Sequence, residues 1–157
     1  MSLENLKTPI LKRGVTGFDP SLPVHDSEAV LKVFKLLQYP FVKNGALNGP
    51  HQSANYFRLT VLNTVEKDRF DVLINGRCWL MAGIKPESTW MQLQFIDLPI
   101  SFKKLFQSIS FLKIFDATVM NRTVPKKELE CLGVTELKQI TYWNSKTYGD
   151  IIFNGYD

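Results

Sequence analysis

The stretch "RFDVLINGRCWLMA", residues 69–82, decides the fold of this 157-residue chain. Two apolar runs flank the pair Asn75-Gly76. An Asn-Gly pair in this setting is typical of a two-residue β-hairpin turn of type I′, whose geometry fixes the register of the flanking strands. The predicted pairs across the hairpin are Ile74 with Arg77, Val72 with Trp79, and Phe70 with Met81.

Neighbouring segments extend this hairpin into a sheet. Residues 57–65 and residues 88–96 alternate apolar with polar side chains, which is typical of half-buried strands. Together with the hairpin they predict a four-stranded antiparallel meander. Residues 111–115 and 137–143 are two further candidate strands, and residues 147–156 fit a strand or a helix equally well.

Three helices are expected. Asp26 is a good N-cap for a helix that stops before Pro40, Pro99 introduces a second helix, and Pro125 opens a short third one that Gly133 ends as its C-cap. The second helix carries an apolar stripe of Phe102, Leu105, Phe106 and Ile109, which should cover the sheet.

The predicted fold is therefore a single α+β domain, residues 1–157, with an antiparallel sheet of about four to six strands and helices packed on one face. Residues 1–24 contain several prolines and glycines and little periodicity, so we expect an extended arm that wraps the domain.

Composition and cysteine content indicate a globular protein of the cytoplasm. The chain is 45% apolar and 22% charged, with no apolar run long enough to span a membrane and no signal-peptide core at its start. The two cysteines, Cys78 and Cys131, lie in segments that read as ordered, and we expect two buried thiols in a reducing compartment.

The net charge of +4 is concentrated in one segment. Between Asp97 and Lys127 there are six basic and two acidic residues. Such a segment suits an acidic protein partner or, as an alternative function, nucleic acid bound through residues 103–127; a solvated lysine face is the simpler interpretation. The six basic residues are Lys103, Lys104, Lys113, Arg122, Lys126 and Lys127.

Motifs for cofactor or metal chemistry are missing from the sequence. There are only two histidines, no pair of ligands at zinc-binding spacing and no phosphate-binding glycine loop, so we predict neither cofactor nor metal and no enzymatic activity. The alternative is a small metal-dependent hydrolase or nuclease in which Glu66, Asp68 and Asp71 hold a cation near His51. A polar turn would explain the same three carboxylates.

The chain ends "YWNSKTYGDIIFNGYD", residues 142–157, and stays apolar almost to its last residue. A segment of this kind should dock and complete the core. Its aromatic residues Trp143, Tyr148 and Tyr156 would then lie at the rim and frame a partner site, because Trp and Tyr dominate interface hot spots.

This ending resembles that of small bacterial toxin-immunity proteins of the polymorphic-toxin and contact-dependent-inhibition type, in which an aromatic-Trp pair precedes Gly-acidic-Ile-Ile-Phe-Asn and a final aromatic-Asp. The matching stretch is about a tenth of the chain, and Gly155 stands where a second bulky aromatic is expected. The resemblance implies a single-domain protein that neutralises a cognate toxin by binding it, without catalysis. With a pI near 9.1, the chain would suit an acidic toxin or a contact outside the toxin's active site.

On this hypothesis the partner-binding residues fall into two groups. Lysines of the basic segment supply charge and aromatic residues of the ending supply anchors. The expected residues are Lys103, Lys104, Lys113, Lys126 and Lys127 for charge, and Trp143, Tyr148 and Tyr156 as anchors.

Overall fold

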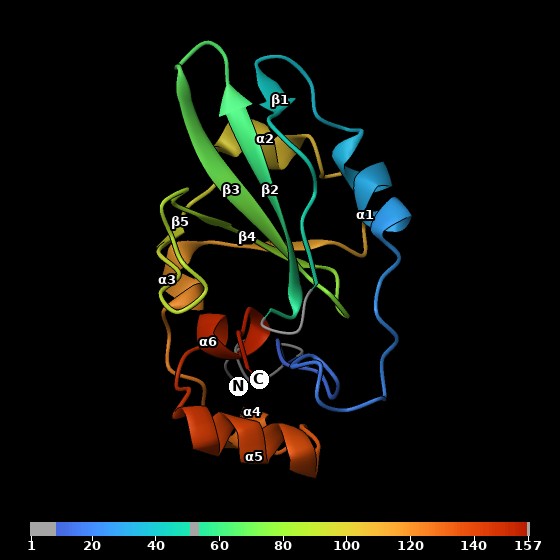
Figure 1. Cartoon of the computed structure of the whole chain (residues 1–157), viewed down its shortest axis with the longest axis vertical. Helices are drawn as coiled ribbons and strands as arrows, with labels where there is room; N and C mark the ends of the chain where they lie inside the picture. The colour runs from blue at the N-terminus through green and yellow to red at the C-terminus, as the bar shows by residue number, and fades with distance from the viewer. Residues whose placement is uncertain (1–8, 51–53, 157) are drawn as a thin grey trace, which may run out of the picture.

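A six-stranded sheet forms the centre of the protein in the computed structural model, which describes residues 9–50 and 54–156 (Figure 1). The order β1-β2-β3-β4-β5 is antiparallel throughout, and the sixth strand runs parallel to β4. The predicted α+β class with an antiparallel sheet is confirmed. The strands are β1 Phe41–Lys43, β2 Tyr56–Asn63, β3 Asp68–Asn75, β4 Leu80–Ile84, β5 Phe95–Ile96 and β6 Lys113–Phe115.

Short helices surround the sheet. They are α1 Ser27–Phe34, α2 Ile100–Lys104, α3 Ala117–Met120, α4 Lys126–Leu129, α5 Val134–Trp143 and α6 Tyr148–Ile152. The start of α1 is as predicted, since the Asp26 side chain accepts a hydrogen bond from the Glu28 N–H at 3.0 Å. Figure 1 places α4 and α5 at the end of the molecule opposite the β2–β3 turn.

Both faces of the sheet are covered, which corrects the prediction of helices on one face. Side chains alternate along β3, so Val72 and Leu73 point into two different apolar clusters. We call the cluster under α1 and α2 the aromatic core; it comprises Val30, Val33, Phe34, Phe41, Phe57, Leu59, Val61, Phe70, Val72, Ile74, Met81, Leu98, Phe102 and Phe106. The cluster under α3, α5 and α6 we call the C-terminal core; it comprises Leu11, Val15, Tyr56, Leu73, Leu80, Ala82, Ile84, Met120, Val124, Leu132, Ile140, Tyr148, Ile151, Ile152, Phe153 and Tyr156.

The predicted hairpin register is wrong by four residues. Ile74 pairs with Met81 rather than Arg77, and neither Asn75 nor Gly76 has the positive φ that a type I′ turn requires. Instead the Asn75 carboxamide oxygen accepts hydrogen bonds from the backbone of Arg77 and Cys78, both at 2.8 Å, and this widens the connection. An even shift preserves the alternation of faces, so Phe70, Val72 and Ile74 still share one face with Met81, as predicted.

Other predicted elements also change. Of residues 88–96 only β5 pairs with β4, and residues 137–143, predicted as a strand, lie within helix α5. Gly133 is the N-cap of α5 rather than the C-cap of α4. The stretch 147–156, left open between strand and helix, contains α6. Strand β6 confirms the candidate at 111–115.

The apolar ending docks, as predicted, against the C-terminal core. Three asparagines fix it there by hydrogen bonds to the backbone. The Asn75 side chain donates to the carbonyls of Ile152 (2.6 Å) and Val15 (3.0 Å), and the Asn55 side chain donates to the same two carbonyls. The side chain of Asn154 donates to Thr16 at 3.1 Å. The chain end, the N-terminal arm and the β2–β3 pair are thus joined at one place.

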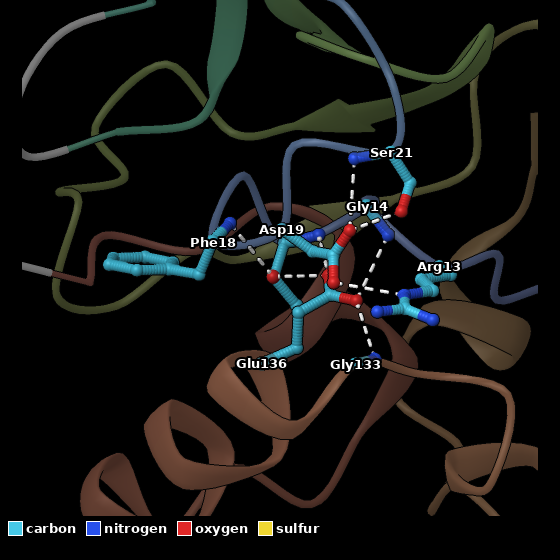
Figure 2. A network of polar contacts seen from close by, with 8 residues as sticks. Arg13, Gly14, Phe18, Asp19, Ser21, Gly133 and Glu136 are labelled. Atoms are coloured by element: carbon cyan, nitrogen blue, oxygen red, sulfur yellow. Dashed lines mark hydrogen bonds and ion pairs between the residues drawn. The ribbon is translucent and has the colours of Figure 1, made fainter.

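A buried carboxylate joins α5 to the same arm (Figure 2). Glu136 has no exposed surface and accepts hydrogen bonds from the backbone of Gly14 (2.9 Å), Thr16 (3.0 Å) and Gly133 (3.0 Å), and from the Thr16 hydroxyl. Three backbone N–H groups and one hydroxyl thus supply hydrogen-bond donors to this buried side chain. Residues 9–24 form neither helix nor strand, yet Leu11 and Val15 are buried, so the described part of the predicted arm is packed.

The cysteine prediction is confirmed only in part. Both thiols are free, but Cys131 is exposed and Cys78 is half-buried, with burial raising the pKa of Cys78 to about 11. Within the described ranges, none of the helices has the length and apolarity needed to cross a membrane.

Candidate functional site

A groove of about 420 Å³ lies beside the C-terminal core. One wall is the loop before β5, another is the turn between α5 and α6, and residues 153–156 complete the lining. A volume of this size lies in the range typical of ligand sites. We call this feature the aromatic groove.

The first wall carries two exposed side chains at the tip of a tight turn. The backbone N–H of Gln92 donates to the Thr89 carbonyl at 3.0 Å, and the N–H of Thr89 donates to the Gln92 carbonyl at 3.3 Å. Trp90 and Met91 therefore lie at the tip of the turn. Trp90 is 47% exposed and Met91 77% exposed. Large apolar side chains held in solvent by an ordered turn are typical of contact surfaces.

Arg58 of β2 anchors this loop to the sheet. Its guanidinium pairs with Asp71 of β3 at 2.5 Å and also donates to the carbonyls of Pro86 (2.9 Å) and Ser88 (3.1 Å). Thr60 adds a hydrogen bond to the same carboxylate at 2.7 Å. Two of the guanidinium nitrogens, Nη1 and Nη2, therefore hold the base of the turn that presents Trp90, while Nε pairs with Asp71.

The second wall is a stacked aromatic pair. The rings of Trp143 and Tyr156 lie nearly parallel, 11° apart, with centroids 6.0 Å from each other. Trp143 remains 38% exposed, whereas Tyr156 is buried and its hydroxyl bonds to that of Ser145. Burial raises the pKa of Tyr156 to about 12, so the phenol stays protonated at neutral pH.

Phe95 and Phe153 form the floor, with ring centroids 6.0 Å apart. Gly149 of α6 permits this approach, because a Cβ at that position would lie 2.4 Å from the Phe95 ring. The floor is thus continuous with the C-terminal core.

Asp150 supplies the only formal charge among the described residues that line the groove. It is exposed and completes a capping box at the start of α6, where its Oδ2 accepts hydrogen bonds from the backbone of Lys146 (3.2 Å) and Thr147 (3.1 Å). The charge is held in place by the helix cap.

Of the three predicted aromatic anchors, the structure brings Trp143 and Tyr156 together in the groove but not Tyr148. Tyr148 is buried in the C-terminal core, and its hydroxyl donates to Glu128. Burial and that carboxylate raise the pKa of Tyr148. Only Trp143 has the exposure expected of an anchor, so placing Tyr148 and Tyr156 at an exposed rim was wrong.

The predicted lysines do not gather around this groove. Lys103 and Lys104 lie on α2, Lys113 on β6, and Lys126 and Lys127 on α4, which Figure 1 shows at the far end of the molecule from α2. Lys103 also pairs with Asp116 at 3.0 Å. The basic segment is contiguous in sequence but not on one face.

The carboxylates proposed for a hydrolase also lie apart. Asp71 is buried against Arg58, while Glu66 and Asp68 are exposed at the β2–β3 turn. His51 lies outside the described residues. Within the described ranges no three His, Cys, Asp or Glu side chains gather as a metal site. The aromatic residues of the alternative nucleic-acid segment are mostly internal, since Phe102 and Phe106 belong to the aromatic core.

Trp90 and Met91 were not predicted as contact residues, because the alternation of Met91, Leu93 and Phe95 with Gln92 and Gln94 indicated a strand. A signal was present: Pro86, Ser88 and Thr89 precede the Trp-Met pair, and residues of these types favour a turn.

No family model, curated protein or solved structure matches this chain.

Proposed function

We propose that this protein is a cytoplasmic binding protein of the immunity type, which neutralises a cognate toxin domain by docking on the aromatic groove rather than by catalysis. The observation that carries the proposal is the gathering of Trp90, Met91 and Trp143, three large exposed side chains from two distant segments, around one groove. Trp is among the residues that contribute most to protein–protein affinity.

The surrounding construction supports a preformed contact surface. One wall is held to the sheet by Arg58, and the other is continuous with the buried chain end. Side chains that are already ordered lose little entropy on binding, which favours tight association. The resemblance of residues 142–157 to the ending of immunity proteins is the second support, because that same segment builds the groove.

The test uses the tagged full-length chain to capture its partner from a lysate of its own source, followed by affinity measurements with the purified pair. Replacing Trp90 and Trp143 together by alanine should weaken the complex by about tenfold or more. Tyr39→Ala is the matched control, because Tyr39 is 79% exposed and does not line the groove.

A partner toxin whose activity is blocked by the wild-type chain and not by the double variant would support neutralisation by binding. Equal affinity of the double variant and the control would place the contact elsewhere and remove the groove from the proposal.

A further inference from the structure

We propose that the aromatic groove recognises a cationic side chain, arginine or lysine, presented by an exposed segment of the partner protein. The inference rests on the proposed function in one respect: it assumes that the groove is the docking site. It adds the chemistry of the side chain that fills it.

Charge complementarity is the first argument. Asp150 is the only charged side chain among the described groove residues, and it belongs to none of the described ion pairs, which join Arg13 with Asp19, Arg58 with Asp71 and Lys103 with Asp116. Its two cap hydrogen bonds both end on Oδ2. Within the described contacts Oδ1 is therefore available to an incoming donor, and a guanidinium or ammonium group is the donor that a carboxylate binds most strongly.

The aromatic walls are the second argument. Trp90 and Trp143 both line the groove and are both partly exposed, and Trp143 is stacked on Tyr156. The negative face of an indole attracts cations, and a planar guanidinium stacks on it as well. An anionic group would be repelled by both the ring faces and Asp150, and an uncharged apolar group would gain no attraction from the carboxylate.

Flexible and polar lining residues suit the stem and backbone of such a segment. Met91 adapts its shape to an aliphatic chain, and the carboxamides of Gln92, Asn121 and Asn144 line the same groove, where they can bond to peptide groups. Arg122 and Lys146 neighbour lining residues in sequence, but neither lines the groove. The overall positive charge of the chain therefore does not set the sign of this site.

The test uses the full-length ¹⁵N-labelled protein and three peptides that differ only at their central residue: acetyl-Gly-Ser-Arg-Ser-Gly-amide and its citrulline and glutamate counterparts. Citrulline keeps the shape of arginine without its charge. The readout is the three indole N–H resonances of Trp79, Trp90 and Trp143. Trp79 is the internal control, because it does not line the groove and stacks instead on His25, with ring centroids 4.1 Å apart.

The expected result is that the arginine peptide shifts the Trp90 and Trp143 signals and leaves Trp79 unchanged, with about three- to fivefold weaker binding of the citrulline peptide. Asp150→Asn should remove most of that difference while retaining an oxygen for the helix cap. If Asp150→Asn does not fold, Trp90→Ala serves instead, since Trp90 lies at an exposed turn; it should lower the affinity for the arginine peptide.

Equal shifts with the arginine and citrulline peptides, shifts that include Trp79 to the same extent, or no shift at millimolar peptide would each overturn the inference. These outcomes are separable from a failure of the proposed function. If the peptides fail but the groove variants still release the partner, only the cationic ligand is wrong. If the arginine peptide binds but the partner is retained by the groove variants, the docking site of the partner is wrong.

Discussion

The two cores of this protein are built on different principles. The aromatic core contains a set of edge-to-face rings, including Phe102 against Phe41 and Phe70 at centroid distances of 5.3 and 5.2 Å. Around the C-terminal core, by contrast, lie buried polar side chains, among them Glu136 and Asn154. One face of the sheet is held by packing and the other by packing together with directed hydrogen bonds.

This difference determines what each side of the molecule can do. Packing of rings is tolerant of small rearrangements, whereas a buried carboxylate with several donors has one satisfactory arrangement. The side that carries the aromatic groove is thus the side whose geometry is most narrowly specified. A preformed binding surface benefits from this, because its walls are fixed before the partner arrives.

The largest expected effect is on the aromatic core. Phe102→Ala should lower the free energy of unfolding by about 3 to 5 kcal/mol, because the side chain is fully buried and its removal leaves a cavity among rings. Urea unfolding followed by circular dichroism measures the change. Ile100→Ala, at a 70% exposed position of the same helix, is the control and should change stability much less. A loss under 1 kcal/mol for Phe102→Ala would show that this face can collapse around the gap.

A smaller effect on the free energy of unfolding is expected from the hydrogen bonds of Glu136 beside the C-terminal core. Glu136→Gln should cost about 1 to 3 kcal/mol, because one carboxylate oxygen becomes an NH₂ group that faces donors of Gly14, Thr16 or Gly133. Hydrogen exchange locates the change: protection should fall in α5 and in residues 12–19 and stay constant in α1 and α2.

Glu130→Gln provides the matched control, since Glu130 is exposed on the neighbouring helical segment. It should leave stability within about 0.5 kcal/mol of the wild type. Loss of protection throughout the chain in Glu136→Gln would contradict the view that the two cores respond separately.

Much of the aromatic-core side could be predicted from the sequence, because its signals are local. Asp26 and the spacing of Val30, Val33 and Phe34 indicate α1, and the stripe of Phe102 and Phe106 indicates that α2 faces inward. Alternation along β2 predicted that Phe57, Leu59 and Val61 share one buried face, as they do, although the register of the hairpin was wrong. Each of these patterns depends on residues within about ten positions of each other.

The C-terminal side could not be predicted in the same way, because its structure depends on contacts between distant segments. Asn75 appears in the sequence as a turn residue, but its side chain is committed to Val15 and Ile152. Residues 137–143 were predicted as a strand, yet they belong to helix α5, whose Glu136 accepts hydrogen bonds from the backbone of Gly14 and Thr16. The aromatic groove was predicted only in part, because it too is built from distant segments. Trp143 was predicted as an anchor, whereas Trp90, from the loop before β5, was not.

The smallest expected effect on stability changes with pH only under acidic conditions. Hydrogen bonds from Ser21 and from the Arg13 guanidinium, the latter at 2.9 Å, lower the pKa of Asp19 from 3.8 to about 2 in the folded protein. Because the pKa of Asp19 is lower in the folded protein than in the unfolded chain, the unfolded chain binds a proton at this carboxylate at a higher pH than the folded protein does. The stabilisation from this carboxylate is therefore complete above about pH 4 and is lost as the pH falls toward 2.

Asp19→Asn isolates this contribution, since asparagine does not titrate. The difference in urea midpoint between wild type and Asp19→Asn should be constant from pH 7 to about pH 4 and should narrow from there toward pH 2. Asp68→Asn, at an exposed position of the β2–β3 turn, controls for the general effect of removing a carboxylate. Asp19 belongs to the loop that also binds Glu136. If the difference in urea midpoint narrows for Asp19→Asn and not for Asp68→Asn, part of the loss of stability in acid therefore arises on the C-terminal side of the sheet. A difference that persists unchanged down to pH 2 would mean that the ionised carboxylate does not stabilise that loop.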